Sequence, residues 1–77
     1  MKIEIHYCAQ WNYKPEAVSL TAEIQGTIAD AEIELFPEGK GIFDVYADGS
    51  LIFSKYKTDR FPKTGEVARS LQLLTSS

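Results

Sequence analysis

Polar and apolar residues alternate along residues 2–7 (KIEIHY), and the same alternation returns at residues 31–36 (AEIELF). A period of two is typical of a β-strand with one buried face and one exposed face. Both stretches therefore predict strands. In the first of them, Ile3, Ile5 and Tyr7 form the side that we expect to meet a hydrophobic core.

Two further β-rich stretches, residues 42–47 (IFDVYA) and 51–56 (LIFSKY), flank the dipeptide Asp48-Gly49. An Asp-Gly pair between such runs favours a tight turn, because both positions adopt positive φ at low cost. These two stretches predict an antiparallel hairpin. Residues 37–41 (PEGKG) and 57–63 are loops by composition.

Apolar residues recur at helical spacing in two stretches, one after Asn12 and one after Thr64. Asn12 and Thr64 are the predicted N-terminal caps, and Gly26 is predicted to end the first helix after residue 25. The predicted apolar faces consist of Ala17, Leu20, Ala22 and Ile24 in the first helix and Val67, Leu71 and Leu74 in the second.

The predicted order of elements is β-α-β-β-β-α. The first β-α-β unit should form a right-handed parallel crossover, and the last two strands an antiparallel hairpin. This order predicts an α+β fold of two layers, with a four-stranded mixed sheet and both helices on one face. The other face would be polar and in contact with water. Its predicted members are Lys2, Glu4, His6, Glu32, Glu34 and Asp44.

The composition and charge of the chain argue against several classes of function. The chain has 77 residues, which predicts a single domain, and its net charge of −3 with a pI of about 5.0 argues against nucleic-acid binding. No apolar run reaches the ~20 residues of a membrane span, and the charged start of the chain does not resemble a signal peptide. A single cysteine forms no internal disulfide, so we expect a reducing compartment, most simply the cytoplasm.

The single cysteine, Cys8, stands where the first predicted strand ends and the chain turns towards a helix. Free backbone N–H groups at a helix start stabilise a thiolate, so a cysteine at such a turn is a candidate nucleophile. A C-x-x-C motif would place its second cysteine at position 11, where this chain has Trp11. The alternative interpretation is that Cys8 is a small buried hydrophobic residue.

Several motifs together resemble the selenoprotein W / Rdx family, which includes the related selenoproteins T and H. They run through nearly the whole chain in the family's order and spacing. The resemblance implies a thioredoxin-like fold and a thiol or selenol oxidoreductase linked to glutathione. The motifs are Tyr7-Cys8, Tyr13-Lys14-Pro15, Gly39-Lys40-Gly41, Phe43-Asp44-Val45, Asp48-Gly49 and Phe61-Pro62.

The chain departs from that family pattern at Trp11, which replaces the second cysteine or selenocysteine. Cys8 is then the predicted catalytic residue of a monothiol protein, with glutathione or a client protein thiol as its reaction partner and no bound cofactor. In the thioredoxin-like sheet that the resemblance implies, the third strand runs beside and antiparallel to the first, so the loop 39–41 should lie beside Cys8. The predicted substrate- or partner-binding residues are Trp11, Tyr13, Gly39, Lys40 and Gly41, with Lys40 as the nearest positive charge and Lys14, Lys57 and Arg60 behind it.

A second hypothesis is a non-catalytic thioredoxin-like module that binds a protein partner through the loops Cys8–Trp11 and Gly39–Gly41. Trp11 favours it, because an exposed tryptophan is a frequent anchor in protein contacts. His6 is expected to be solvated, and no metal site is predicted. We expect a monomer or a weak dimer.

Overall fold

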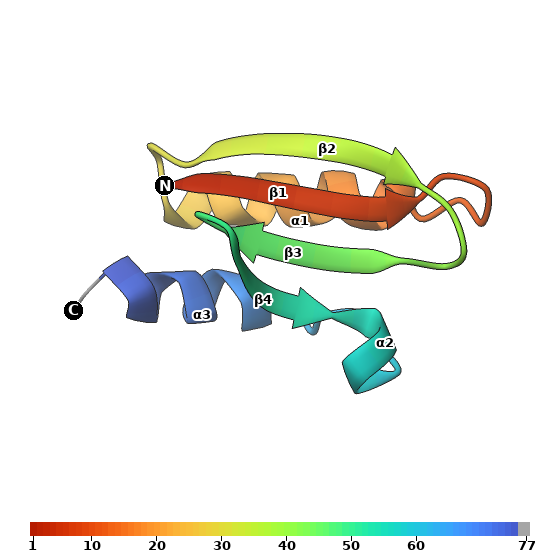
Figure 1. Ribbon diagram of the computed structural model, residues 1–77. Helices are drawn as coiled ribbons and strands as arrows, with labels where there is room; N and C mark the ends of the chain where they lie inside the picture. Colours follow the sequence, from red (N-terminus) through yellow and green to blue (C-terminus); the bar gives the residue numbers. More distant parts are fainter. Residues whose placement is uncertain (76–77) are drawn as a thin grey trace.

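The computed structural model describes residues 1–75 and contains four strands and three helices (Figure 1). Strands β1 to β4 and helices α1 and α3 match the predicted order, and one short helix is additional. The bounds are β1 Lys2–Cys8, α1 Lys14–Thr27, β2 Glu32–Glu38, β3 Phe43–Ala47, β4 Ser50–Ser54, α2 Lys55–Thr58 and α3 Glu66–Thr75.

The strands form one sheet in the order β2-β1-β3-β4. Strand β1 pairs in parallel with β2 and antiparallel with β3, and β3 pairs antiparallel with β4. The end of β1 therefore lies beside the end of β2 and the start of β3. The mixed sheet predicted from the order of the elements is confirmed, and it brings the residues around Cys8 and the loop 39–41 to one end of the sheet.

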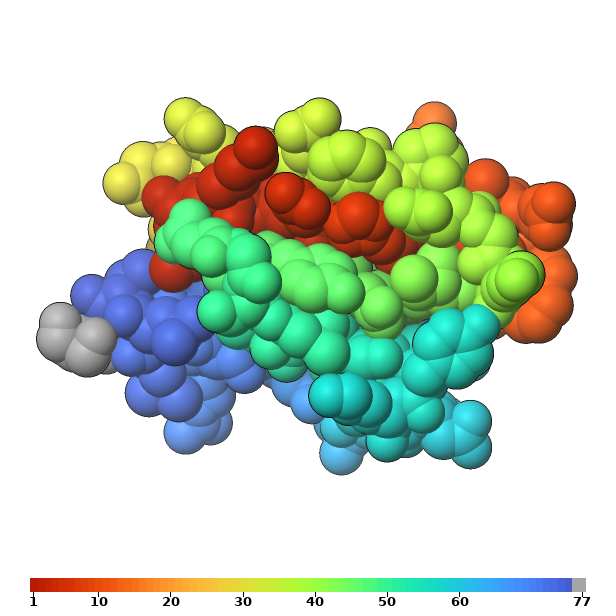
Figure 2. All heavy atoms as spheres, in the orientation of Figure 1, coloured from red at the N-terminus to blue at the C-terminus, as the bar shows by residue number. Residues whose placement is uncertain are grey.

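Both long helices, α1 and α3, lie on the same side of the sheet (Figure 1). Their apolar faces and the inward side of the strands form one core, because helices on one face bury only that side of each strand. The outward side of the strands is not covered by a helix (Figure 2). The core consists of Ile3, Ile5, Tyr7, Ala17, Leu20, Ile24, Ile28, Phe43, Val45, Ala47, Phe53, Val67 and Leu71. The predicted two-layer α+β fold is thus confirmed.

The ends of α1 differ from the prediction. Asn12 does not cap the helix: its φ is +59°, and Tyr13 precedes the first helical residue without a capping side-chain hydrogen bond. Gly26 does not stop the helix either. The helix continues through Gly26 to Thr27, and extended Ile28 ends it with a backbone N–H bond to the carbonyl of Ile24. Ile28 is buried, and the chain leads from it to β2.

The fourth strand is shorter than predicted, because the chain bends into the single turn of α2 after Ser54. Lys55 and Tyr56, which were predicted to lie in the strand, belong to this helix. Asp59 ends it with φ of +57°, the left-handed conformation that Asp tolerates better than most residues. This bend returns Tyr56 towards the start of β3.

Helix α3 begins at Glu66, one residue later than a cap at Thr64 predicts. Gly65 precedes it with φ of +83°, and the backbone N–H of Gly65 donates to the carboxylate of Glu23 on α1. That bond joins the two helices. Leu74, which was predicted to share the apolar face of Val67, is 51% exposed.

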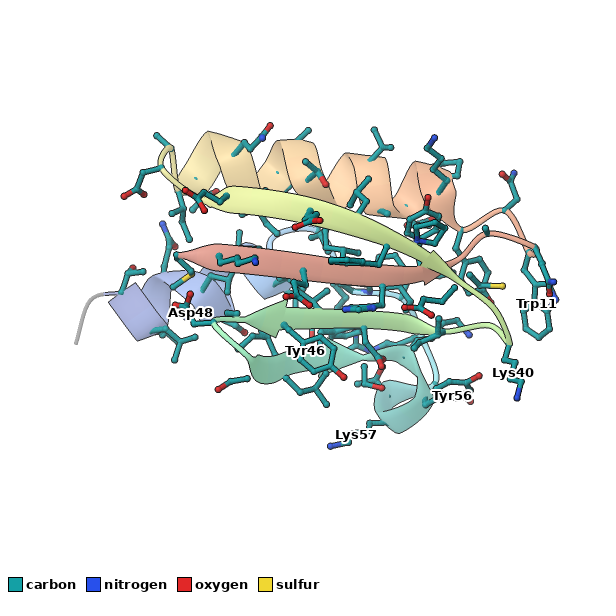
Figure 3. All side chains as sticks on the ribbon, turned by 45° about the horizontal axis from the view of Figure 1, so that its top comes forward. Trp11, Lys40, Tyr46, Asp48, Tyr56 and Lys57 are labelled. Carbon is teal, nitrogen blue, oxygen red and sulfur yellow. The ribbon has the colours of Figure 1, made fainter. Side chains whose placement is uncertain are left out.

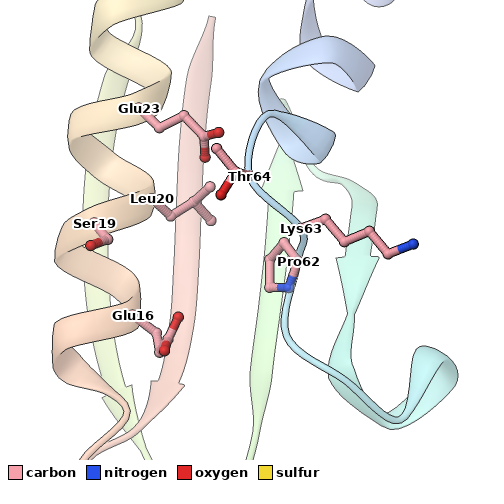
Figure 4. A pocket seen from close by; sticks show the side chains of 7 residues that line it. All are labelled: Glu16, Ser19, Leu20, Glu23, Pro62, Lys63 and Thr64. Atoms are coloured by element: carbon pink, nitrogen blue, oxygen red, sulfur yellow. The ribbon is translucent and has the colours of Figure 1, made fainter.

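A shallow polar hollow of about 340 Å³ lies between α1 and the segment that leads into α3 (Figure 4). Its lining residues are Glu16, Ser19, Leu20, Glu23, Pro62, Lys63 and Thr64. None of them belongs to the predicted site. Within residues 1–75, no helix has the length and apolar character needed to cross a lipid bilayer.

Candidate functional site

Cys8 is the last residue of β1, and the short connection to α1 folds back over it. The backbone N–H of Tyr13 donates to the carbonyl of Cys8 at 3.1 Å, and that of Asn12 donates to the carbonyl of Ala9 at 3.3 Å. Ala9 is in turn bonded to the end of β2 through the carbonyl of Glu38 at 3.0 Å. This connection leaves the Cys8 side chain completely buried.

The Cys8 sulfur has one defined polar contact, with the backbone N–H of Trp11 at 3.3 Å from Sγ. The sequence indicated N–H groups of the helix start as donors to this thiol, whereas the structure supplies one from the turn that precedes α1. The same turn also shields the sulfur from solvent.

Trp11 lies against the loop 39–41. A Cβ atom added to Gly41 would be only 2.5 Å from Cζ3 of the indole, so the ring rests on the glycine backbone. The ring is nevertheless 61% exposed, and it lies with Lys40 at the same end of the molecule (Figure 3). The loops that the sequence predicted to adjoin one another are in direct contact.

The loop 39–41 has a fixed conformation. Lys40 and Gly41 both have positive φ, +62° and +71°, and Gly39 accepts a bond from the backbone N–H of Ile42 at 3.4 Å. The hydroxyl of Tyr56 on α2 donates to the carbonyl of Lys40. Tyr56 was not predicted as a site residue, because its position in an apolar run suggested a strand.

An aromatic row continues from Trp11 into the core. The ring of Trp11 meets that of Tyr13 edge-on at 6.2 Å, Tyr13 meets Phe61 at 4.7 Å, and Phe61 meets buried Phe43 at 5.3 Å. Lys55 places Nζ 5.7 Å from the Tyr13 ring centre. Tyr13 therefore links the exposed indole to the core, which explains its place beside the site.

The basic residues predicted to lie near Cys8 differ in their surroundings. Lys14, Lys40 and Lys57 are exposed, whereas Arg60 forms a bidentate pair with Glu66 at 2.7 and 3.0 Å. The guanidinium of Arg60 and the backbone N–H of Lys63 lower the pKa of Glu66 to about 2. Lys40 is exposed at the loop tip. Arg60 is thus occupied by a structural pair and is not a ligand for the thiol.

His6 was expected to be simply solvated, and this is wrong. Its Nδ1 lies 2.9 Å from a carboxylate oxygen of Glu38 and its Nε2 lies 3.1 Å from one of Glu4. Burial lowers the pKa of His6, but the hydrogen bonds and charges of the two glutamates outweigh it and leave this pKa above 6.5. The alternating pattern placed these residues on one face, but it gave no register for Glu38.

No set of three His, Cys, Asp or Glu side chains among residues 1–75 is arranged to hold a metal ion. Each ring nitrogen of His6 has one glutamate partner, and an imidazole that carries both protons donates to both of them. The candidate site is therefore built from one thiol, backbone groups and aromatic rings.

This combination defines a thioredoxin-like α+β protein with a cysteine at the turn from the first strand to the first helix. Residues 2–73 match the model of the Rdx family, and the chain belongs to that family. No curated protein sequence shows a significant match.

Solved structures agree with this assignment. The crystal structure of a selenoprotein W-related protein from Vibrio cholerae superposes with a TM-score of 0.87 at 25% identity, covering 95% of this chain and 94% of the other. A protein from Bordetella parapertussis gives the same score and identity, with 92% of each chain covered. Family and fold together suggest a thioredoxin-like redox role.

Proposed function

We propose that this protein is a thiol redox protein that uses Cys8 as a monothiol and glutathione as its co-substrate. The observation that carries the proposal is the backbone N–H of Trp11, which points at the Cys8 sulfur from 3.3 Å. Membership of the Rdx family supports a redox role at this position. Such chemistry belongs in a reducing compartment such as the cytoplasm.

The proposed reaction uses one thiolate twice. The Cys8 thiolate attacks the glutathione sulfur of a protein–glutathione mixed disulfide, which forms a Cys8–glutathione disulfide and releases the client thiolate. A second glutathione thiolate then attacks the glutathione sulfur of that adduct, which releases oxidised glutathione and restores the Cys8 thiolate. The net change transfers one disulfide bond from the client to glutathione.

The attack requires access to a sulfur that is buried in the resting structure. Residues 9–13 cover it, and the contact between Trp11 and Gly41 holds this connection in place. Displacement of Trp11 would open the path to Sγ. A mixed disulfide with Cys8 is therefore expected to form slowly in the native protein and faster once Trp11 is removed.

The test is to incubate folded wild-type protein, Trp11→Ala and Cys8→Ser with oxidised glutathione and to measure the adduct by mass spectrometry. Wild-type protein unfolded in urea is the positive control for the reagent. We expect a single adduct on the native wild type, more rapid formation on Trp11→Ala and none on Cys8→Ser. Adduct formation only in urea, for both the wild type and Trp11→Ala, would show that Cys8 is an inert core residue.

A second function is favoured by a different observation: Cys8 is buried, whereas Trp11 and Tyr56 are 61% and 64% exposed at the same end of the molecule. In this alternative the loops Cys8–Trp11 and Gly39–Gly41 bind a protein partner without redox chemistry. Partners retained from a reduced extract should then be lost with Trp11→Ala and kept with Cys8→Ser. Val18→Ala, which shortens another exposed apolar residue on α1, is the matched control.

A further inference from the structure

The outward face of the sheet lies opposite the core and carries no helix (Figures 1 and 2). The strand register arranges its side chains in rows. Glu4 of β1 lies level with Glu34 of β2 and Tyr46 of β3, and the next row holds His6 between Phe36 and Asp44. Three strands therefore contribute to one continuous surface, which adjoins the candidate thiol site at Glu38, the register partner of Cys8.

This surface, which we call the acidic face, has more negative than positive groups. Glu34 and Asp44 form no ion pair within residues 1–75, and Glu4 and Glu38 share the single imidazole of His6. Oδ1 of Asp44 is a buried oxygen without a hydrogen-bond partner. The acidic face consists of the carboxylates Glu4, Glu32, Glu34, Glu38 and Asp44, the cations Lys2 and His6, and the apolar residues Phe36, Tyr46 and Leu51.

Aromatic rings lie at the centre of the acidic face. Phe36 stacks on His6 with ring centres 4.7 Å apart, and Tyr46 meets His6 edge-on at 5.4 Å. Leu51, which pairs with Tyr46 across the hairpin, is 38% exposed. Tyr46 lies midway along the sheet in Figure 3. Charged groups that surround an apolar centre are the usual arrangement of a protein contact surface.

We propose that the acidic face is the docking surface for a lysine- or arginine-bearing segment of another protein. The argument is charge complementarity. Cations placed over Glu34 and Asp44 would gain from carboxylates that form no ion pair within residues 1–75, and more so over Asp44, which is partly shielded from water. The stems of lysine or arginine and adjacent apolar residues would pack on Phe36, Tyr46 and Leu51.

The same charges argue against other occupants. A second copy of this chain would bring two acidic faces together, and like charges in an interface cost several kcal/mol. Anionic lipid headgroups and nucleic acids are repelled for the same reason. A basic protein segment is the occupant that satisfies both the carboxylates and the rings.

The test uses two synthetic peptides of equal charge, one alternating lysine with leucine and the other lysine with serine. Each is titrated into the whole protein while its amide NMR spectrum and the dissociation constant are recorded. We expect shifts confined to the outward residues of β1, β2 and β3 and to Leu51 of β4, and tighter binding of the leucine peptide. The double variant Glu32→Gln and Glu34→Gln should bind roughly tenfold more weakly.

The matched control is Glu16→Gln with Asp30→Asn, which removes the same charge from exposed positions on α1 and in the turn that follows it. This control should bind the leucine peptide as the wild type does. An equal loss of affinity for the leucine peptide in both double variants would show that the peptide is attracted by net charge alone, and would overturn the proposal. Shifts centred on Trp11 and Tyr56, or no binding of either peptide at low salt, would also overturn it.

Discussion

The indole of Trp11 rests on the backbone of Gly41, which joins the connection that covers Cys8 to the loop before β3. Gly41 is buried and has φ of +71°, so two independent constraints select glycine there. A side chain would collide with the ring, and an L-residue would be strained. The position of Trp11 and the cover over Cys8 therefore depend on a residue thirty positions away in the chain.

Gly41→Ala should consequently displace Trp11 and destabilise the fold. The strain of positive φ alone costs about 1–2 kcal/mol, and loss of the ring contact adds to it. Urea unfolding gives the free energy, and fluorescence reports on the ring because the chain has one tryptophan. We expect emission at longer wavelength in the folded variant, as the indole becomes more hydrated.

Gly39→Ala is the control for that substitution. Gly39 belongs to the same loop but has no positive φ, and the nearest atom to an added Cβ is the flexible amide oxygen of Gln10 at 3.9 Å. The Gly39→Ala variant should leave the tryptophan fluorescence unchanged and alter the free energy of unfolding by less than Gly41→Ala does. Similar changes in stability and fluorescence for the two variants would mean that the contact between Trp11 and Gly41 does not contribute to the stability of the fold.

The loop 39–41 has a second support in Tyr56, whose hydroxyl donates to the carbonyl of Lys40. Tyr56→Phe removes this bond and keeps the ring. Because Tyr56 is 64% exposed, the expected loss of unfolding free energy is at the lower end of the usual range, about 0.5 kcal/mol. Amide hydrogen exchange should increase at residues 39–42 but not in α3. Unchanged exchange in this loop would show that the hydroxyl does not hold it.

The alternating pattern predicted this fold well because it reports which side of a strand is buried, and buried Ile3 and Val45 confirm it. It failed where tertiary contacts decide local structure. Lys55 and Tyr56 continue a β-rich stretch, yet they leave the strand for α2, where Tyr56 reaches Lys40. Gly26 is the residue type that usually ends a helix, yet α1 continues to Thr27 and ends at buried Ile28.

At the site, the sheet order was sufficient to bring the loop 39–41 towards Trp11. The sequence left two interpretations of Cys8 open, a reactive thiol or a small buried residue, and the structure shows it buried under a connection held by backbone hydrogen bonds. The contacts of His6 with Glu4 and Glu38 were not predictable from the sequence. Only the register of β1 against β2 shows that Glu38 can reach the imidazole.

His6 should make stability depend on pH. Its pKa is higher in the folded protein than its usual value of 6.5, so folding favours the protonated form. Its contribution is fully present below pH 6.5 and is lost as pH rises through the folded pKa. The difference in unfolding free energy between wild type and His6→Asn should therefore grow as pH falls towards about 6.

The chain has a single histidine, so one imidazole proton resonance follows the titration directly. Its midpoint should lie above 6.5 in the wild type and move down in Glu38→Gln, which removes the partner at Nδ1. Glu32→Gln, on the same strand but without a bond to His6, is the control. A wild-type midpoint at or below 6.5 would contradict the assigned role of the two glutamates.

The ion pair of Arg60 and Glu66 should make stability depend on pH in the direction opposite to that of His6. The pKa of Glu66 is lowered to about 2 by Arg60 and by the backbone N–H of Lys63, so folding favours the carboxylate. Its contribution is present above the usual value of 4.5 and is lost as pH falls towards 2. Glu66→Gln should therefore be less stable than wild type near neutral pH, with the difference shrinking in acid.

Glu16→Gln is the control for this prediction, because Glu16 is exposed in the first turn of α1 and belongs to no ion pair in the described chain. It should not reproduce the dependence on pH. Since Glu66 also begins α3 and fixes the segment after Arg60, a difference that persists unchanged down to pH 2 would assign its effect to helix initiation rather than to the ion pair.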